Sequence, residues 1–345
     1  MENKNILINQ NKSILDALFR LNKITKISRL ILFVVNNDEQ VIGSLTDGDV
    51  RRALVKKQDL NLQLKHICNK NFVHLRETDS YINFQIFRDQ DLKILPILNS
   101  DNSLSRIIDL DVITSHLPIE CMIMAGGRGK RLSPLTDNIP KPMLKLGEKP
   151  IIEHNIDRLI SFGIKKIYIS LNYLGDQIES YFGDGKDKGI EIEYIREDKF
   201  MGTAGSLSLI KDIKSEHILL MNGDLFTNVD FEKMYSKLIN QKADMVIASK
   251  NYKVDVPYAI FNSENSQISS FKEKPSYIYH SNSGIYIFDK KLINKIPKNS
   301  FYDITDLIQD ILTDKKVIHD TIRGYWIDIG KPVDYERALE FCKHQ

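Results

Sequence analysis

Apolar and polar positions alternate in short blocks along the first third of the chain. Residues 32–45 read as an apolar strand, a polar turn and a second apolar strand, and residues 95–108 repeat this order. Apolar residues at helical spacing in 13–19 predict an amphipathic helix, and we expect such helices to precede and follow the strands of each copy. Because each copy is too small to bury its own apolar face, the two copies should pack against each other.

The pattern changes near residue 117. Two glycines and one proline precede this point, whereas 15 glycines and 9 prolines follow it, so loops with special backbone angles concentrate in the second part. Beyond the boundary, the apolar runs 121–125 and 217–221 are typical of buried strands in a parallel sheet. We therefore expect two domains, 1–117 and 118–345, with an α/β fold in the second.

Length and composition fit a cytoplasmic protein of two globular domains. The 345 residues are 42% hydrophobic and 27% charged, and 48 basic residues are balanced by 46 acidic ones. This balance is unlike that of a dedicated nucleic-acid-binding protein, and no apolar run approaches the ~20 residues that span a bilayer. The three cysteines are far apart without metal-ligand spacing, and residues 1–13 lack a secretory signal. We therefore expect a reducing cytoplasm and neither a nucleic-acid nor a membrane partner.

A glycine-rich basic segment follows the first apolar run of the second domain. Residues 126–132 read Gly-Gly-Arg-Gly-Lys-Arg-Leu. Glycines let backbone N–H groups approach phosphate oxygens, and the basic side chains supply cations, so a triphosphate is the ligand that this segment favours. A dinucleotide-binding loop would need a third glycine where Leu132 stands, and a Walker A loop would need a Gly-Lys-Ser/Thr sequence. In isolation the segment also fits a basic surface turn.

The next segment, Pro140-Lys141-Pro142, holds a lysine between two prolines that restrict its backbone. Together, residues 124–136 and 140–144 resemble the signature of sugar-1-phosphate nucleotidyltransferases, and the resemblance extends from about residue 119 to 344. It implies a Rossmann-like mixed-sheet domain in which a sugar 1-phosphate attacks the α-phosphorus of a nucleoside triphosphate and releases pyrophosphate. Arg131 and Lys141 would then neutralise phosphate charge. The residues that the resemblance assigns to the nucleotide are Ala125, Gly126, Gly127, Arg128, Gly129, Arg131, Gly202, Thr203 and Asp224.

Two aspartates follow apolar runs that are far apart in the sequence. Asp224 comes three residues after the run 217–221, and Asp328 lies within 325–332, which reads Tyr-Trp-Ile-Asp-Ile-Gly-Lys-Pro. A carboxylate at the carboxyl end of a strand lies where open α/β sheets bind ligands. Each aspartate alone also fits a turn or N-cap residue. The family resemblance implies that both bind Mg²⁺, which needs one or two carboxylates when phosphate oxygens and water complete its octahedron.

Base and sugar recognition are assigned by the same resemblance. Residues 202–205, Gly-Thr-Ala-Gly, resemble the base and ribose contact of the family, in a form closer to guanylyltransferases than to thymidylyltransferases. In the Lys-Glu-Lys-Pro stretch, Glu273 would accept hydrogen bonds from sugar hydroxyls, and Lys274 would pair with the sugar 1-phosphate as a third catalytic group. Without the family context, these segments also fit a helix start and an exposed charged turn. The expected sugar-binding residues are Tyr258, Glu273, Lys274 and Asn282.

The repeat in the first domain resembles a tandem pair of cystathionine-β-synthase-type (CBS) domains over residues 5–117. Thr46 and Asp49 match the positions that hold an adenosine nucleotide in that family, and the second copy has Ile108 where the threonine belongs. The resemblance implies one regulatory adenine-nucleotide site per chain, and a homodimer or higher oligomer formed through these modules. A dimerisation module that binds no nucleotide is the alternative.

A CBS pair joined to this catalytic domain resembles the glucosamine-1-phosphate guanylyltransferases of bacterial legionaminic-acid synthesis. The combination implies that GTP and a hexosamine or hexose 1-phosphate give a GDP-sugar for a surface glycan, with GDP-glucosamine as the expected product. The alternatives are a mannose- or heptose-1-phosphate guanylyltransferase, a uridylyltransferase, or a catalytically silent nucleotide-sensing subunit.

Overall fold

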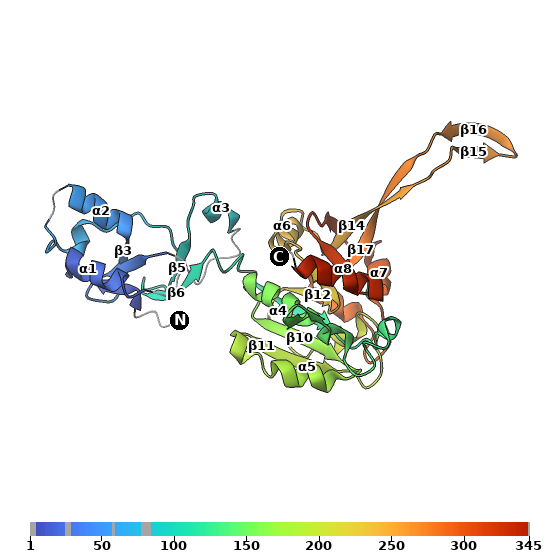
Figure 1. The fold of residues 1–345 in the computed structure, drawn as a ribbon, viewed down its shortest axis with the longest axis horizontal. Helices are drawn as coiled ribbons and strands as arrows, with labels where there is room; N and C mark the ends of the chain where they lie inside the picture. The colour runs from blue at the N-terminus through green and yellow to red at the C-terminus, as the bar shows by residue number, and fades with distance from the viewer. Residues whose placement is uncertain (1–4, 25–28, 57–58, 77–83, 344–345) are drawn as a thin grey trace. The chain divides into compact units, whose positions relative to one another are not determined.

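The chain divides into two units between His116 and Leu117. The computed structural model describes residues 5–24, 29–56, 59–76 and 84–343, and the two units are Met1–His116 and Leu117–Gln345 (Figure 1). The division falls one residue before the boundary expected from the sequence. Among the described residues, no helix combines the length and the apolar character needed to cross a membrane.

The first unit contains two copies of a small three-stranded sheet. In each copy the first two strands are parallel and the last two are antiparallel, so the predicted repeat is confirmed. The first copy consists of β1 (Leu7–Asn9), α1 (Ile14–Leu21), β2 (Ile31–Val35), β3 (Val41–Thr46), α2 (Asp47–Val55) and the 3₁₀ helix η2 (Leu64–His66). The second copy consists of β4 (Leu75–Arg76), α3 (Gln85–Arg88), β5 (Ile94–Leu98) and β6 (Leu104–Asp109).

The two copies differ in the residue that follows as a helix cap at the end of the last strand. α2 begins with a capping box, in which the Asp49 N–H donates to Thr46 Oγ1 at 3.3 Å and the Thr46 N–H donates to the Asp49 carboxylate at 2.8 Å. Ile108 stands at the corresponding place in the second copy and has no oxygen that caps a helix. Residues 110–118 form turns and irregular backbone, so the prediction of a helix after the second copy is wrong.

Each copy has a buried cluster of its own, and a further cluster joins the two copies, as expected for units too small to fold alone. Their turns are also joined, because Gln40 Nε2 donates to the Asp101 carbonyl at 2.9 Å and the Val41 N–H donates to the Asn102 carbonyl at 2.9 Å. The buried cluster that combines side chains of both copies is formed by Ile6, Phe33, Val35, Val41, Ile94 and Leu98.

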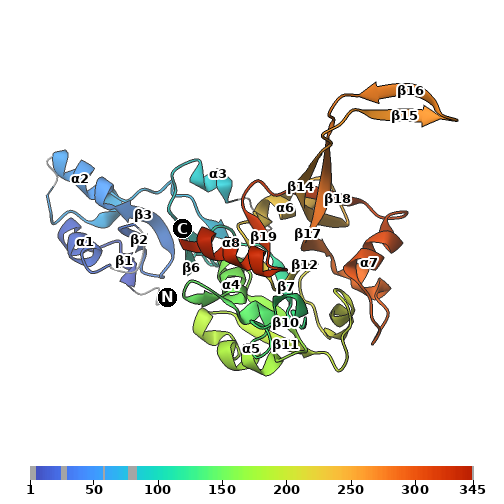
Figure 2. The ribbon, with the colours of Figure 1, turned by 45° about the vertical axis from the view of Figure 1, so that its right-hand side comes forward.

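A seven-stranded mixed sheet forms the centre of the second unit (Figure 2). Its strand order is β11-β10-β7-β12-β17-β14-β18, in which the first four strands are parallel and β17 is antiparallel to both neighbours. The predicted Rossmann-like mixed sheet is confirmed, and the runs 121–125 and 217–221 belong largely to β7 and β12. The strands are β7 (Ile119–Met124), β10 (Lys166–Leu171), β11 (Glu191–Arg196), β12 (His217–Asn222), β14 (Met245–Asp255), β17 (Ser276–Asp289) and β18 (Val317–Thr321).

Helices and short strand pairs complete the second unit. The α-helices are α4 (Ile151–Ser161), α5 (Gly175–Phe182), α6 (Phe231–Asn240), α7 (Ile304–Ile311) and α8 (Pro332–Lys343). The 3₁₀ helices are η3 (Lys130–Leu132), η4 (Lys141–Met143), η5 (Lys186–Lys188), η6 (Gly205–Leu209) and η7 (Lys290–Lys295). The short pairs are β8 (Lys145–Leu146) with β9 (Lys149–Pro150) and β13 (Leu225–Thr227) with β19 (Trp326–Asp328).

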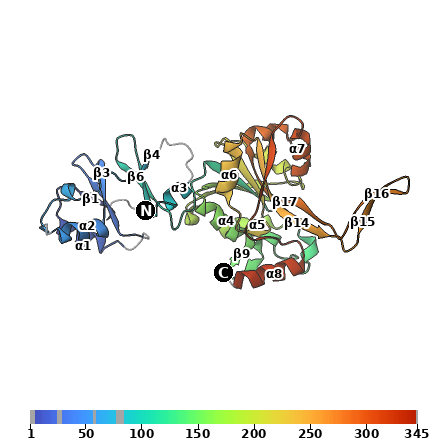
Figure 3. The ribbon, with the colours of Figure 1, turned by 90° about the horizontal axis from the view of Figure 1, so that it is seen from above.

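A two-stranded arm, defined here as residues 250–281, projects from this sheet (Figures 1, 2 and 3). β14 and β17 form its stem and remain paired as far as Asp255 and Ser276. β15 (Ile260–Glu264) and β16 (Gln267–Lys272) form its tip. Most of its side chains are exposed.

Candidate active site

Two loops leave neighbouring strands at the same edge of the sheet. β7 and β12 are parallel neighbours, with Met124 paired to Asn222 at their carboxyl ends. The Gly223 N–H donates to the Met124 carbonyl at 2.9 Å, and a Cβ on Gly223 would lie 2.8 Å from that oxygen, so only glycine fits this approach. The glycine-rich loop after β7 therefore lies beside Asp224, where open α/β sheets bind ligands.

A cavity of about 360 Å³ lies at this edge. The basic segment lines it, so this segment is more than a surface turn. Eight of the expected site residues are in the lining: Gly126, Gly127, Gly129, Arg131, Lys141, Gly202, Thr203 and Asp224. The other lining residues are Met124, Lys130, Ser170, Glu197, Phe200, Asn222 and Gly330.

Ala125 and Arg128, also expected to bind the nucleotide, lie outside this lining. Ala125 is buried directly after β7, and its N–H donates to the Ser170 carbonyl at 3.2 Å. The Arg128 guanidinium lies over the Tyr173 ring, 5.6 Å from its centroid. In this structure both residues therefore contact the segment 170–173 and do not face the cavity.

Lys141 and Asp224 form the charged centre of the cavity. The flanking prolines place Lys141 at the start of η4, where the residue is only 8% exposed, and its ammonium pairs with Asp224 Oδ2. The other carboxylate oxygen, Asp224 Oδ1, is buried and has no hydrogen-bond partner among the residues that the structure describes. A buried charged oxygen without a partner costs free energy, which a bound cation would remove.

The second expected metal ligand is brought to the same place by strand pairing. β13 and β19 are antiparallel with Leu225 opposite Asp328, and the Ile329 N–H donates to the Asp224 carbonyl at 3.2 Å. Desolvation by the surrounding protein, followed by the nearby Asp224 carboxylate, raises the pKa of Asp328, although the residue as a whole is exposed and lies outside the cavity lining. Two adjacent carboxylates that repel each other fit a divalent cation. No cluster of three or more His, Cys, Asp or Glu occurs in the described parts of the chain.

Glu197 is a lining residue that the sequence analysis did not single out. It follows β11, so the rule that drew attention to Asp224 at the end of a strand could have found it. The residue is 7% exposed, and its Oε2 accepts from the Met201 N–H at 3.1 Å. Burial raises the pKa of Glu197. A buried carboxylate therefore forms one wall of the cavity.

Thr203 connects the cavity wall to α7. Its N–H and hydroxyl both donate to Asp303 Oδ1, at 2.9 and 3.0 Å, and its Oγ1 accepts from the Ile304 N–H at 2.9 Å. Asp303 forms the capping box of α7 with Asp306, so its carboxylate both starts the helix and holds Thr203. Gly202 has a φ of +79°, and a Cβ there would lie 2.7 Å from the Tyr302 carbonyl, so this tight connection requires glycine.

None of the four expected sugar-binding residues lines this cavity. Tyr258, Glu273 and Lys274 are exposed residues of the arm. Asn282 lies in β17, where its Oδ1 accepts from the Gly284 N–H at 3.0 Å and from the Tyr286 hydroxyl at 2.9 Å. The structure thus unites the triphosphate and metal residues and leaves the sugar residues elsewhere.

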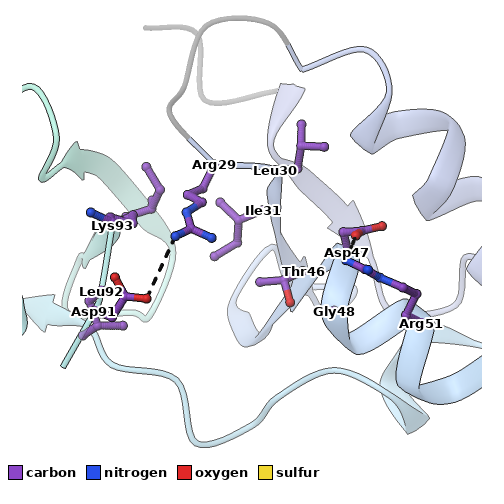
Figure 4. A pocket seen from close by; sticks show the side chains of 11 residues that line it. Arg29, Leu30, Ile31, Thr46, Asp47, Gly48, Arg51, Asp91, Leu92 and Lys93 are labelled. Atoms are coloured by element: carbon purple, nitrogen blue, oxygen red, sulfur yellow. Dashed lines mark hydrogen bonds and ion pairs between the residues drawn. The ribbon is translucent and has the colours of Figure 1, made fainter.

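A second cavity, of about 560 Å³, lies between the two copies in the first unit (Figure 4). Thr46 lines it, whereas Asp49 does not, because its carboxylate caps α2 and pairs with Arg52. The charged side chains around this cavity belong to Arg29, Asp47, Arg51, Asp91 and Lys93. Its other lining residues are Leu30, Ile31, Gly48, Leu92 and Ile94.

The cavity of the second unit has the features of an enzyme that transfers nucleotidyl groups: a basic glycine-rich loop for phosphates beside a lysine and two carboxylates. Sequence comparison gives the family. Residues 120–345 match the nucleotidyl transferase family, to which the chain therefore belongs, and residues 1–56 match the CBS domain.

Three known proteins show how far the similarity extends. The chain is 32% identical over 232 residues to D-glycero-α-D-manno-heptose 1-phosphate guanylyltransferase of Aneurinibacillus thermoaerophilus, covering 66% of this chain and 99% of that protein. It is 29% identical over 242 residues to UTP–glucose-1-phosphate uridylyltransferase of Synechocystis, covering 64% of this chain and only 62% of that protein. HddC from Yersinia pseudotuberculosis, complexed with GMP-PN, has a TM-score of 0.51 at 27% identity, covering 66% of this chain and 100% of that chain. These relatives include a guanylyltransferase and a uridylyltransferase. Membership of the family therefore establishes sugar-1-phosphate nucleotidyl transfer but does not identify the base.

Proposed function

We propose that the chain is a guanylyltransferase that converts GTP and a hexosamine or hexose 1-phosphate into a GDP-sugar and pyrophosphate. GDP-glucosamine is the proposed product, made for a surface glycan of the legionaminic-acid type. The buried Glu197 carboxylate in the cavity wall is the observation that carries the choice of base. The similarity to a heptose 1-phosphate guanylyltransferase supports the same choice.

A carboxylate selects guanine by the arrangement of hydrogen-bond donors on the base. Guanine presents its N1–H and N2–H₂ groups side by side, and the two oxygens of one carboxylate can accept from both. Uracil and thymine present one N–H between two carbonyl oxygens, which a carboxylate repels. Because the Met201 N–H holds Glu197 Oε2 in place, the side chain is preorganised to read this edge of the base.

The remaining lining residues act on the phosphates. The N–H groups of residues 126–129 and the Arg131 guanidinium bind triphosphate oxygens, and Lys141 neutralises charge at the α-phosphate. A sugar-phosphate oxygen attacks the α-phosphorus in line, the bond to the β-phosphate oxygen breaks, and pyrophosphate leaves. Mg²⁺ held by Asp224 and Asp328 would supply further charge neutralisation at the reacting phosphates.

The rival functions differ in how they use this cavity. A mannose- or heptose-1-phosphate guanylyltransferase would keep the same base site and change only the sugar. A uridylyltransferase would leave Glu197 facing a base that offers it two acceptors. A silent nucleotide-sensing subunit has no use for Lys141 and Asp224 beside a phosphate-binding loop.

Pyrophosphate release over a matrix of nucleoside triphosphates and sugar 1-phosphates, with Mg²⁺, tests the proposal. We expect the highest kcat/KM with GTP and glucosamine 1-phosphate. A preference for UTP would refute the choice of base. A preference for mannose or heptose 1-phosphate with GTP would keep the base and replace the sugar.

We also propose that the cavity of the first unit binds a regulatory adenine nucleotide. The cavity of about 560 Å³ is large enough for a small ligand, and Arg29, Arg51 and Lys93 supply cations for a phosphate. Calorimetry of the full chain with ATP, ADP and AMP tests this. We expect one adenine nucleotide per chain and a change in transferase rate. If none of the three binds, the first unit is a dimerisation module.

A further inference from the structure

Phe200 and Phe301 form an exposed aromatic pair beside the cavity of the second unit. Their ring centroids are 5.9 Å apart and the rings are tilted by 54°, an arrangement that stabilises aromatic pairs. Each residue nevertheless remains 55% exposed, and Phe200 is part of the cavity lining. Phosphates and metal ions make no use of a large apolar ring. The ring therefore indicates contact with an apolar part of the ligand.

Backbone hydrogen bonds hold the segments of the two rings together. The Tyr302 N–H donates to the Met201 carbonyl at 3.0 Å, so the residue after Phe301 is joined to the residue after Phe200. The N–H groups of residues 204 and 205 both donate to the Tyr302 carbonyl at 3.0 Å. The aromatic pair is therefore fixed by the fold before any ligand binds, which lowers the cost of binding.

The same loop carries the carboxylate that is proposed to recognise the base. Glu197 lies three residues before Phe200 and also lines the cavity. Its Oε2 accepts from the N–H of Met201, the residue directly after Phe200, at 3.1 Å. One short segment therefore positions both the carboxylate and the ring. A base can use both contacts, because its edge forms hydrogen bonds and its faces stack on aromatic rings.

We propose that Phe200 is a stacking platform for the base of the nucleotide and that Phe301 positions its ring. The inference deepens the proposed function and rests on it in one respect, because it takes Glu197 to recognise the edge of the same base. Aromatic side chains can stack on every base, since every base has a π-face. A purine offers a larger face than a pyrimidine, so the platform adds to the preference for guanine over uracil.

Calorimetric titration of the full chain with GDP, UDP and inorganic tripolyphosphate, each with Mg²⁺, tests the platform. Tripolyphosphate can occupy the phosphate site but has no base. Phe200→Ala should weaken GDP binding at least about fivefold, weaken UDP binding less, and leave tripolyphosphate binding unchanged. The lining of the first unit's cavity contains neither ring, so a nucleotide bound there contributes equally in the wild type and the variant.

Further variants separate stacking from general apolar contact. Phe200→Tyr keeps an aromatic ring and should retain the affinity for GDP, whereas Phe200→Leu keeps an apolar side chain without a π-face and should weaken GDP binding nearly as much as alanine does. Wild-type affinity in Phe200→Leu would overturn stacking. Phe301→Ala should weaken GDP binding about two- to fivefold and leave tripolyphosphate binding unchanged. Phe19→Ala, at a 62% exposed residue of α1, is the control and should match the wild type.

The outcomes separate this inference from the proposed function. Tighter binding of UDP than of GDP by the wild type refutes the choice of guanine, but the platform is still supported if Phe200→Ala weakens both nucleotides and spares tripolyphosphate. Equal weakening of all three probes means that the ring only stabilises the loop, and the inference fails. It also fails if Phe200→Ala binds both nucleotides as the wild type does. Weakened self-association of that variant in sedimentation would then assign the aromatic pair to a contact between chains.

Discussion

The two cavities of this chain contain similar residue types and hold their charges differently. In the first unit, Asp47 pairs with Arg51 at 2.5 Å and Arg29 approaches Asp91 at 4.0 Å, and all four side chains are well exposed to water. In the second unit, Lys141 is nearly buried and pairs with Asp224, and Asp224 Oδ1 has no partner among the described residues. The two cavities therefore differ in the burial of their charged side chains and in the Asp224 carboxylate oxygen that lacks a hydrogen-bond partner among the described residues.

This difference indicates what each cavity can do. Exposed ion pairs contribute about 0–1 kcal/mol, so a ligand can rearrange them at little cost, which suits reversible binding. A buried carboxylate oxygen without a partner destabilises the free protein until a cation arrives. Charges that are already fixed and desolvated stabilise a reacting phosphate without reorganisation. These features suit the second cavity to the proposed reaction and the first cavity to the proposed binding of a regulatory nucleotide.

The largest expected effect comes from removing the charge of Asp224. Asp224→Asn should lower the rate of pyrophosphate release by at least about 1,000-fold, because a Mg²⁺ ligand at the transferring phosphate is lost. The fold should remain intact, although Lys141 loses its partner and the unfolding temperature falls. Asp314→Asn, at an exposed aspartate of the same unit, is the matched control and should keep the wild-type rate. A near-normal rate in Asp224→Asn at saturating Mg²⁺ would remove this residue from the metal site.

A smaller effect is expected in base selection. Glu197→Gln should reduce the ratio of kcat/KM for GTP over UTP by about 10- to 100-fold, since an amide offers guanine one acceptor instead of two. Glu193→Gln, an exposed glutamate of β11, should leave the ratio unchanged. If both variants keep the wild-type ratio, other atoms recognise the base, and the assignment of Glu197 to guanine recognition is wrong.

In the first unit, Thr46→Val should weaken adenine-nucleotide binding about five- to tenfold and change the transferase rate by less than tenfold. The same substitution removes the cap of α2, so stability should fall by about 1 kcal/mol. Ser13→Ala removes the equivalent cap of α1 and provides the control, because Ser13 does not line the cavity. Calorimetry and thermal unfolding separate the two effects. Equal loss of nucleotide affinity in both variants would show that Thr46 acts through helix stability alone.

The smallest effect concerns pH. Because the pKa of Asp328 is raised above its ordinary value, the carboxylate takes up its proton at a higher pH than a free aspartate. Mg²⁺ needs the ionised form, so its apparent affinity should increase as pH rises through this pKa and weaken as pH falls. The Mg²⁺ concentration for half-maximal rate, measured from acidic to neutral pH, checks the direction. An affinity that stays constant over this range would mean that Asp328 does not contact the metal.

Local patterns predicted much of the second unit, because its main motifs are short continuous stretches of sequence. The apolar runs of β7 and β12 and the glycine-rich loop depend on neighbouring residues, and the structure places them where strand ends meet. Glu197 directly follows β11, so the rule for carboxylates at strand ends could have identified it, whereas its burial depends on distant segments that no local pattern shows. The position of the arm also depends on tertiary structure. The sequence motif around Glu273 therefore does not reveal that this residue lies outside the cavity lining.

In the repeat of the first unit, the sequence pattern predicted the strands correctly and one helix incorrectly. Its strands were predicted from the apolar pattern, whereas no helix follows β6, where Ile108 replaces the capping threonine of the first copy. Ile108 aligned well with Thr46 as a strand residue, yet it lacks the hydroxyl that begins α2. Alignment of two copies therefore predicted strands better than helices, because a strand needs a pattern and a helix start needs one particular atom.

Equilibrium titration of the full chain with Mg²⁺·GTP and with ATP, without sugar phosphate, tests the separation of the two cavities most directly. The account predicts that Asp224→Asn weakens Mg²⁺·GTP binding more than about tenfold and leaves ATP binding unchanged. Thr46→Val should weaken ATP binding about five- to tenfold and leave Mg²⁺·GTP binding unchanged. If one substitution weakened both ligands equally, or if Asp224→Asn bound Mg²⁺·GTP as the wild type does, the assignment of a reaction site to one cavity and a regulatory site to the other would be contradicted.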